Sequence, residues 1–149
     1  MKKGETFSHV CTSVKGTRKL ARAFVRALRR RSSAVVLFDA PMGAGKTTFT
    51  AECVKALGAS VPVTSPTFSI INSYAENIFH VDLYRLEEVS ELRNTDFYEI
   101  ISGENFVFIE WAEKFDIQYP PGAIRVKITV GEGGERVFTV CQLLDKNVD

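Results

Sequence analysis

The stretch VVLFDAPMGAGKTTF, residues 35–49, decides the fold that we expect for this chain. It continues an apolar run that starts at Ala34, and such a run is typical of a strand buried on both faces of a largely parallel sheet. A glycine-containing loop follows, and residues 47–57 have helical propensity and end before Gly58, a suitable residue after a helix. Strand, loop and helix in this order are what a phosphate-binding loop requires.

The loop APMGAGKTT, residues 40–48, contains the groups of such a site. Backbone N–H groups at the start of a helix converge on an anion, and lysine and hydroxyl side chains complete a nucleotide site. The opening residue is Ala40 where glycine is usual, and it is acceptable if its φ angle stays negative. We expect the nucleotide to contact Met42, Gly43, Ala44, Gly45, Lys46, Thr47 and Thr48. Gly43 and Gly45 should adopt positive φ angles, Lys46 should reach the β- and γ-phosphates, and Thr47 should bind Mg²⁺.

Two acids end neighbouring apolar segments. Glu110 closes FVFIE, and Asp82 closes FHVD. A hard cation such as Mg²⁺ takes oxygen ligands and keeps several waters, so an acid at the end of a strand suits it. We expect one acid to bind the metal and the other to position water or to reach the metal through water. Each could instead be a surface carboxylate that caps the next helix.

Composition favours one soluble domain over residues 1–149. The longest apolar run is far below bilayer length, so we expect no membrane span and a cytoplasmic location. Three widely spaced cysteines without a CxxC pair argue against a disulfide framework or a zinc site, and they fit a reducing cytosol.

The remaining elements complete an α/β domain. We expect a helix over residues 17–31, capped by Thr17, with one apolar face and one basic face. A polar loop at residues 64–67 should precede a strand that reaches Tyr74, and a further strand should end near Asp82. Short helices are predicted at 87–92 and 96–101, a strand at 105–111 and a hairpin at 123–140. The predicted fold is a P-loop NTPase-like, three-layer αβα domain with a mostly parallel central sheet and a C-terminal β-hairpin.

Charge is unevenly distributed along the chain. Residues 1–60 hold 12 Lys and Arg against 3 Asp and Glu, whereas residues 61–149 hold 7 against 15. The basic face of the first helix contains no acid, so it is either a solvated face or a surface for tRNA or an acidic partner.

Four motifs occur in order: GAGKTTF at 43–49, SPTF at 65–68, HVDLYRL at 80–86 and IEWAE at 109–113. In this combination the chain resembles the TsaE family, the small P-loop ATPases of bacterial threonylcarbamoyladenosine synthesis. The resemblance implies that it binds and hydrolyses ATP with Mg²⁺ while docked on the TsaB and TsaD proteins. That pair transfers the threonylcarbamoyl group to an adenosine of certain tRNAs, so any contact with tRNA would be made through the complex.

The resemblance also implies roles for individual positions. The catalytic residues would be Lys46, Asp82 and Glu110, and the metal ligands would be Thr47 and Glu110. Thr67 would lie near the γ-phosphate, and Trp111 would contact the nucleotide or a partner, although a tryptophan there could also simply fill the core.

The sequence departs from the family pattern in the loop and after the second acid. Ala40 and Pro41 replace Gly and Asp, and Ala112 stands where proline is common. Any role of the family's loop aspartate is therefore not carried over to this chain.

Two other functions remain open. A small-molecule P-loop kinase would need an acceptor pocket and an arginine-rich lid, but few cations follow Glu110: Lys114, Arg125, Lys127, Arg136 and Lys146. A nucleotide-dependent interaction module would depend more on partner contact than on turnover. The chain lacks the NKxD sequence that reads guanine in GTPases, which favours ATP.

Overall fold

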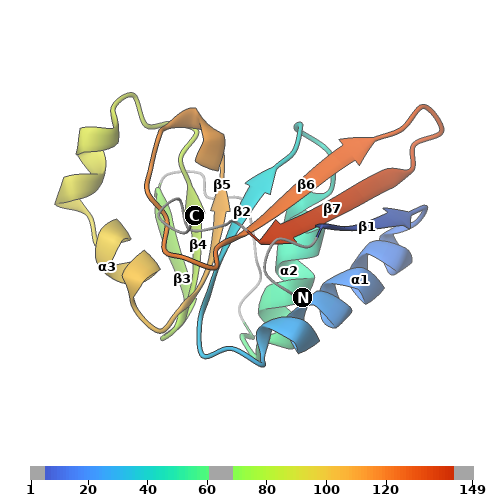
Figure 1. Ribbon diagram of the computed structural model, residues 1–149, viewed down its shortest axis with the longest axis horizontal. Helices are drawn as coiled ribbons and strands as arrows, with labels where there is room; N and C mark the ends of the chain where they lie inside the picture. The colour runs from blue at the N-terminus through green and yellow to red at the C-terminus, as the bar shows by residue number, and fades with distance from the viewer. Residues whose placement is uncertain (1–5, 61–68, 143–149) are drawn as a thin grey trace, which may run out of the picture.

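A seven-stranded sheet forms the centre of the computed structural model, which describes residues 6–60 and 69–142 (Figure 1). In chain order the strands are β1 (Thr6–Cys11), β2 (Ala34–Asp39), β3 (Ile71–Ala75), β4 (Ile78–Asp82), β5 (Phe106–Glu110), β6 (Ile124–Val130) and β7 (Arg136–Gln142). Across the sheet they follow the order β1-β7-β6-β2-β5-β4-β3. The central pairs β6–β2, β2–β5 and β5–β4 are parallel, and the outer pairs are antiparallel. The mixed α/β class, the parallel centre and the C-terminal hairpin are therefore confirmed.

Helices cover both faces of the sheet. The helices α1 (Val14–Leu28) and α2 (Lys46–Ala56) lie on one face. The other face carries α3 (Phe97–Ser102) and the 3₁₀ helices η1 (Val89–Asn94) and η2 (Ala112–Lys114). Figure 1 shows the two groups on opposite sides of the strands. No helix of the described segments is long and apolar enough to cross a bilayer.

The central strand β2 explains why both faces need cover. Its residues alternate between the two cores: Val36 and Phe38 pack toward α1 and α2, whereas Val35 and Leu37 pack toward α3 and η1. All four are buried. A continuous apolar run is therefore used on both faces, as the sequence predicts for a strand in the middle of a parallel sheet.

The helix α1 begins earlier than expected. Ser13 is its N-cap, and the Ser13 hydroxyl accepts the Gly16 N–H at 3.0 Å. The prediction that Thr17 caps this helix is wrong, because Thr17 lies buried within the first turn and donates its hydroxyl proton to the Ser13 carbonyl. Both residues are good caps by type, and burial of the first turn decides between them.

Part of the basic face of α1 fastens the helix to its neighbours. Arg22 forms an ion pair of 2.8 Å with Glu52 of α2, and Arg29 donates to the Ala56 carbonyl at the end of α2. Arg31 donates to the Gly122 carbonyl at 2.9 Å. These three arginines therefore have a structural role, whether the rest of the basic face is simply solvated or binds tRNA or an acidic partner.

Two further elements differ from expectation. The strand β1 was not expected, and its first five residues are exposed at the sheet edge, so its sequence carries little of the apolar signal that marks a strand. The segment predicted as a helix at 87–92 forms the 3₁₀ helix η1, shifted two residues along the chain. The polar loop predicted at 64–67 lies outside the described residues.

One aromatic side chain joins the elements that carry the glycine loop. Phe49 of α2 is fully buried, and its ring centroid lies 5.5 Å from that of Phe24, 5.9 Å from Phe38 and 5.1 Å from Phe138. It therefore contacts α1, β2 and β7 at the same time.

We expect Phe49→Ala to lower the free energy of unfolding by about 3–5 kcal/mol, because it leaves a cavity among three other rings. Phe7→Ala is the control, since Phe7 is 54% exposed on β1, and a surface change of this kind should cost less than about 0.5 kcal/mol. Urea denaturation of both variants measures the difference. Equal losses would contradict the central role of Phe49.

Candidate functional site

The loop between β2 and α2 has the backbone geometry of an anion site. Gly43 has a φ angle of 78°, and Gly45, the residue immediately before α2, has a φ angle of 100°. Within the described residues Trp111 is the one non-glycine residue with positive φ, so Ala40 has the negative φ on which its acceptability in the loop depends. The loop leads directly into the N-terminus of α2, where free N–H groups and the helix dipole favour negative charge.

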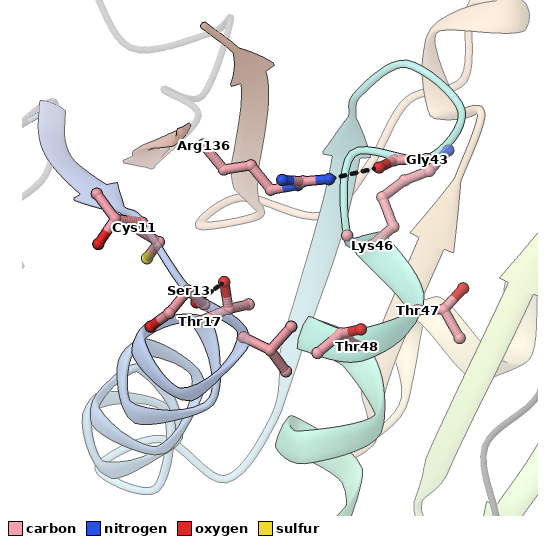
Figure 2. Close-up of a pocket in the computed structure, with 11 residues that line it drawn as sticks. Cys11, Ser13, Thr17, Gly43, Lys46, Thr47, Thr48 and Arg136 are labelled. Atoms are coloured by element: carbon pink, nitrogen blue, oxygen red, sulfur yellow. Dashed lines mark hydrogen bonds between the residues drawn. The ribbon is translucent and has the colours of Figure 1, made fainter. Parts of the chain in front are cut away.

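A pocket of about 500 Å³ opens beside this loop (Figure 2). One wall is formed by residues 11–14 and Thr17, at the junction of β1 and α1. The opposite wall is formed by Gly43 and residues 45–48, and Arg136 of β7 lies between the two walls. The volume is within the range of small-molecule sites, about 300–1,000 Å³.

Lys46 is the first residue of α2, and its side chain is directed toward the end of β5. It is 9% exposed. Its Nζ atom lies 5.2 Å from the centroid of the Trp111 ring, a distance at which an ammonium is attracted to an indole face. The sequence predicts that Lys46 and Trp111 belong to one site, and the fold brings them together.

Glu110 places a buried carboxylate beside this lysine. It is 4% exposed at the end of β5, and its Oε2 atom lies 3.4 Å from Nε2 of His80. Burial by itself raises the pKa of Glu110, but the neighbouring His80 and the positive charge of Lys46 lower that pKa by more, so the net shift is downward. At 3.4 Å the contact is long for a hydrogen bond, and His80 Nε2 has no other partner in the described residues. The carboxylate is ionised at neutral pH.

Asp82 lies next to Glu110 across the parallel pair β4–β5. The two residues are register partners, so their side chains leave the same face of the sheet. One oxygen of Asp82 accepts the Tyr84 N–H at 2.9 Å, and therefore part of its hydrogen-bonding capacity shapes the following turn. Asp82 does not cap the next helix, because the N-cap of η1 is Glu88, and the second oxygen of Asp82 can take another partner.

Trp111 adopts an unusual backbone conformation. Its φ and ψ angles are 61° and 33°, in the left-handed region. Strain of this kind in a bulky residue clusters at functional sites. The ring packs 4.9 Å from that of Tyr84, and Lys114 donates to the carbonyls of Tyr84 and Leu86. The segment after β4 is thus tied to the segment after β5.

The other expected residues occupy different environments. Met42 is 83% exposed, whereas Ala44 is fully buried and packs into the core. Thr48 faces the pocket, and the Thr47 side chain points away from α1 (Figure 2). Thr67 lies outside the described residues.

The donors near the loop suit a hard cation that keeps part of its water shell. Among the described residues, no three His, Cys, Asp or Glu side chains gather into a metal-binding group. A divalent ion here would therefore draw ligands from a hydroxyl, a single carboxylate, phosphate oxygens and water.

Arg136 is the main contributor that sequence reasoning did not assign to the site. It lies about ninety residues beyond the loop in the chain, in a strand of alternating pattern, and no motif marks it. Its guanidinium nevertheless donates to loop carbonyls, at 2.7 Å to Ala44 and 3.0 Å to Gly43. The pocket wall at residues 11–14 was missed for a related reason, because the strand that places it was not expected.

We expect Glu110→Gln to flatten the acid limb of the stability profile. The pKa of Glu110 is lower in the folded state than in the unfolded chain, so its charge stabilises the fold above the ordinary glutamate pKa of about 4.3. This stabilisation is lost as the pH falls through the lower folded value. As the pH falls below about 5, the wild-type free energy of unfolding should therefore fall more steeply than that of the variant.

Urea denaturation at each pH measures these slopes. Glu132→Gln changes an exposed acid in the β6–β7 turn and serves as the control. Parallel curves for the wild type and Glu110→Gln would contradict the assigned electrostatics.

The comparisons with known proteins agree on one family. The family model described as "Threonylcarbamoyl adenosine biosynthesis protein TsaE" matches residues 11–138. A tRNA threonylcarbamoyladenosine biosynthesis protein TsaE from Rickettsia conorii is 33% identical over 136 residues, covering 89% of this chain and 76% of the relative. The protein of the same name from Nostoc is 41% identical over 114 residues, covering 70% of this chain and 68% of the relative.

A solved structure supports the fold. The crystal structure of Bacillus subtilis YdiB superposes with a TM-score of 0.73 and 23% identity, covering 97% of this chain and 90% of that one. At this identity the likeness concerns the fold alone. The family model and the two relatives identify the family: this chain belongs to the TsaE family, whose members take part in threonylcarbamoyladenosine biosynthesis.

Proposed function

We propose that this protein is the ATP-binding and ATP-hydrolysing subunit of a tRNA threonylcarbamoyladenosine synthesis system, a Mg²⁺-dependent ATPase that acts in the cytoplasm with the TsaB–TsaD complex. The observation that carries the proposal is the placement of Lys46. It starts α2 directly after a left-handed Gly45, and it lies within electrostatic reach of the buried Glu110. We interpret residues 1–149 as one P-loop NTPase-like αβα domain.

The nucleotide would lie across the N-terminus of α2. Its phosphates would meet the N–H groups of Gly43 and of residues 45–48, and the adjoining pocket of about 500 Å³ has room for the nucleoside. ATP is proposed over GTP because no guanine-reading NKxD sequence is present.

Thr47 and Glu110 would hold Mg²⁺. The fit rests on the chemistry of the donors, since a hydroxyl beside the phosphate loop and an ionised carboxylate are hard oxygen ligands. When bound, the ion supplies neutralisation of charge on the β- and γ-phosphates.

The residues of the chain would assist hydrolysis in different ways. Lys46 offsets negative charge on the γ-phosphate, and its burial strengthens this effect by excluding solvent. Asp82 orients the attacking water with the oxygen that the Tyr84 amide leaves available. Trp111 forms a wall beside the Lys46 ammonium, and Thr67 would complete the γ-phosphate side.

Exposed apolar side chains near the site support an interaction with partner proteins. Met42 is 83% exposed in the loop, and Tyr84 is 54% exposed where it packs on Trp111. Methionine and tyrosine are enriched in protein interfaces. A partner that covers this edge could supply a further charge-stabilising group, which would explain low turnover by the isolated subunit.

The alternative of a small-molecule kinase receives less support. Of the five cations after Glu110, Lys114 and Arg136 donate to backbone carbonyls and are therefore committed within the fold. The remaining cations are too few for an arginine-rich lid. Transfer of label from γ-labelled ATP to a metabolite, without release of phosphate, would favour the kinase.

The decisive measurement is phosphate release from ATP by the protein alone and with TsaB and TsaD added. We expect stimulation by the partners, and Lys46→Ala should reduce the stimulated rate by about 10²–10³-fold, because it removes a preorganised positive charge. Lys55→Ala is the matched control, since Lys55 is an exposed lysine in the last turn of the same helix. Absence of stimulation, or equal rates for the two variants, would count against the proposal.

We also expect Ala40→Gly to change ATP affinity by less than about tenfold, or about 1.4 kcal/mol. Ala40 has an ordinary negative φ, so its methyl group causes no backbone strain for glycine to relieve. Isothermal titration of ATP into both proteins measures the effect. A larger gain in affinity would mean that the methyl group intrudes on the ligand.

A further inference from the structure

A single arginine fastens the phosphate-binding loop to the C-terminal hairpin. Arg136 donates from Nε to the Ala44 carbonyl at 2.7 Å. From Nη2 it donates to the Gly43 carbonyl at 3.0 Å (Figure 2). It also donates from Nη1 to the Gly134 carbonyl, at 3.0 Å, in the β6–β7 turn. Three of its five N–H donors are therefore engaged by backbone oxygens.

The geometry of this contact requires arginine. The two loop carbonyls belong to consecutive residues, and a planar guanidinium presents its donors in a fixed fork that can reach both. A lysine ammonium carries the same charge on a flexible stem and has no such fork. Charge alone would therefore not reproduce the contact.

The anchored carbonyls also determine where the loop amides point. In a trans peptide the C=O of one residue and the N–H of the next point in opposite directions. Holding the Gly43 carbonyl therefore directs the Ala44 N–H away from Arg136. That N–H donates to the Pro41 carbonyl at 3.3 Å. Holding the Ala44 carbonyl directs the Gly45 N–H away from Arg136 in the same manner.

The loop has a particular need for an external restraint. Gly43 and Gly45 are the residues with the greatest backbone freedom, and both adopt positive φ angles in the folded state. The Arg136 side chain packs closely on the second of them, since its Cδ and Nε atoms lie 3.5 Å from the position that a Cβ atom on Gly45 would occupy. Such a contact limits the alternative conformations of the loop.

Arg136 is itself held in place by the sheet. It is the first residue of β7, and it is a register partner of Val130 on β6 and of Cys11 on β1. Cys11 belongs to the wall of the same pocket. The position of the guanidinium is therefore set by three strands at the edge of the fold.

From these contacts we propose that Arg136 is a positioning residue for the nucleotide: it holds the loop in the conformation that binds phosphate, and it makes the β6–β7 hairpin part of the site. This inference rests on the proposed function, in which the loop binds the phosphates of ATP. Arg136 acts through the loop backbone rather than by contact with the reacting atoms. Its removal leaves the glycines free to take other conformations, and binding must then reorder them.

The test compares Arg136→Ala and Arg136→Lys with Arg125→Ala. Arg125 is an exposed arginine on β6, so its removal deletes the same charge from the same hairpin and leaves the loop contacts intact. Titration calorimetry with ATP and Mg²⁺ should give a dissociation constant about tenfold higher for both Arg136 variants, the size expected from the loss of hydrogen bonds that order the loop. The Arg125 variant should bind within about twofold of the wild type.

Amide hydrogen exchange at Ala44 in the unliganded proteins provides a readout that needs no ATP, because this N–H is hydrogen-bonded to the Pro41 carbonyl within the loop. We expect faster exchange at this amide in both Arg136 variants, with the core strands unchanged. Wild-type binding and exchange in Arg136→Lys would overturn the proposal, because charge alone would then suffice. Unchanged exchange in Arg136→Ala would overturn it as well.

The two readouts separate this inference from the proposed function. If the wild type gives no heat with ATP, the proposed function fails, and the exchange experiment still decides whether Arg136 orders the loop. If the wild type binds ATP and all three variants bind equally well, the role of Arg136 fails and the proposed function stands.

Discussion

The parallel pairing of β2, β5 and β4 is the constraint on which the site depends. Parallel strands end at the same edge of a sheet, so the glycine loop after β2, Glu110 at the end of β5 and Asp82 at the end of β4 meet there although they are distant in sequence. The strand register determines which side chains meet there, since Glu110 is the partner of Phe38 on one side and of Asp82 on the other. A shift of one residue would turn the carboxylates to the opposite face.

Two opposite charges are buried at this edge of the sheet. Lys46 and Glu110 are both almost inaccessible to solvent, and each reduces the cost of burying the other. Tyr74 and His80 extend the arrangement into the core, with Tyr74 Oη lying 3.5 Å from His80 Nδ1. Opposite charges held in a poorly solvated position would suit the binding of a triphosphate and its metal ion that we propose for this site.

The elements that could be predicted are those marked by short patterns in the sequence. Elements whose formation depends on contacts between distant segments could not be predicted. The apolar run of β2, the stop at Gly58 and the alternation of the hairpin are properties of short windows, and all three elements form as expected. The strand β1 has few apolar residues facing the core, and its pairing with β7 joins segments that no window contains. The choice of Ser13 over Thr17 as cap likewise depends on which turn is buried.

The same division applies to the site. The sequence predicts a role for Lys46, Asp82 and Glu110 because each begins or ends an element whose type can be predicted from the sequence. It predicts none for Arg136, because a contact between a strand residue and a carbonyl about ninety positions away leaves no local pattern. The place of His80 beside Glu110 likewise depends on the pairing of β4 with β5.

The position of Trp111 has a practical consequence. The chain contains one tryptophan, and its indole ring lies close to both the Tyr84 ring and the Lys46 ammonium. The tryptophan component of the ultraviolet emission therefore arises at a single known place, next to the charge that a polyphosphate would engage. The native chain thus carries its own optical reporter of that place, and no dye or label has to be attached.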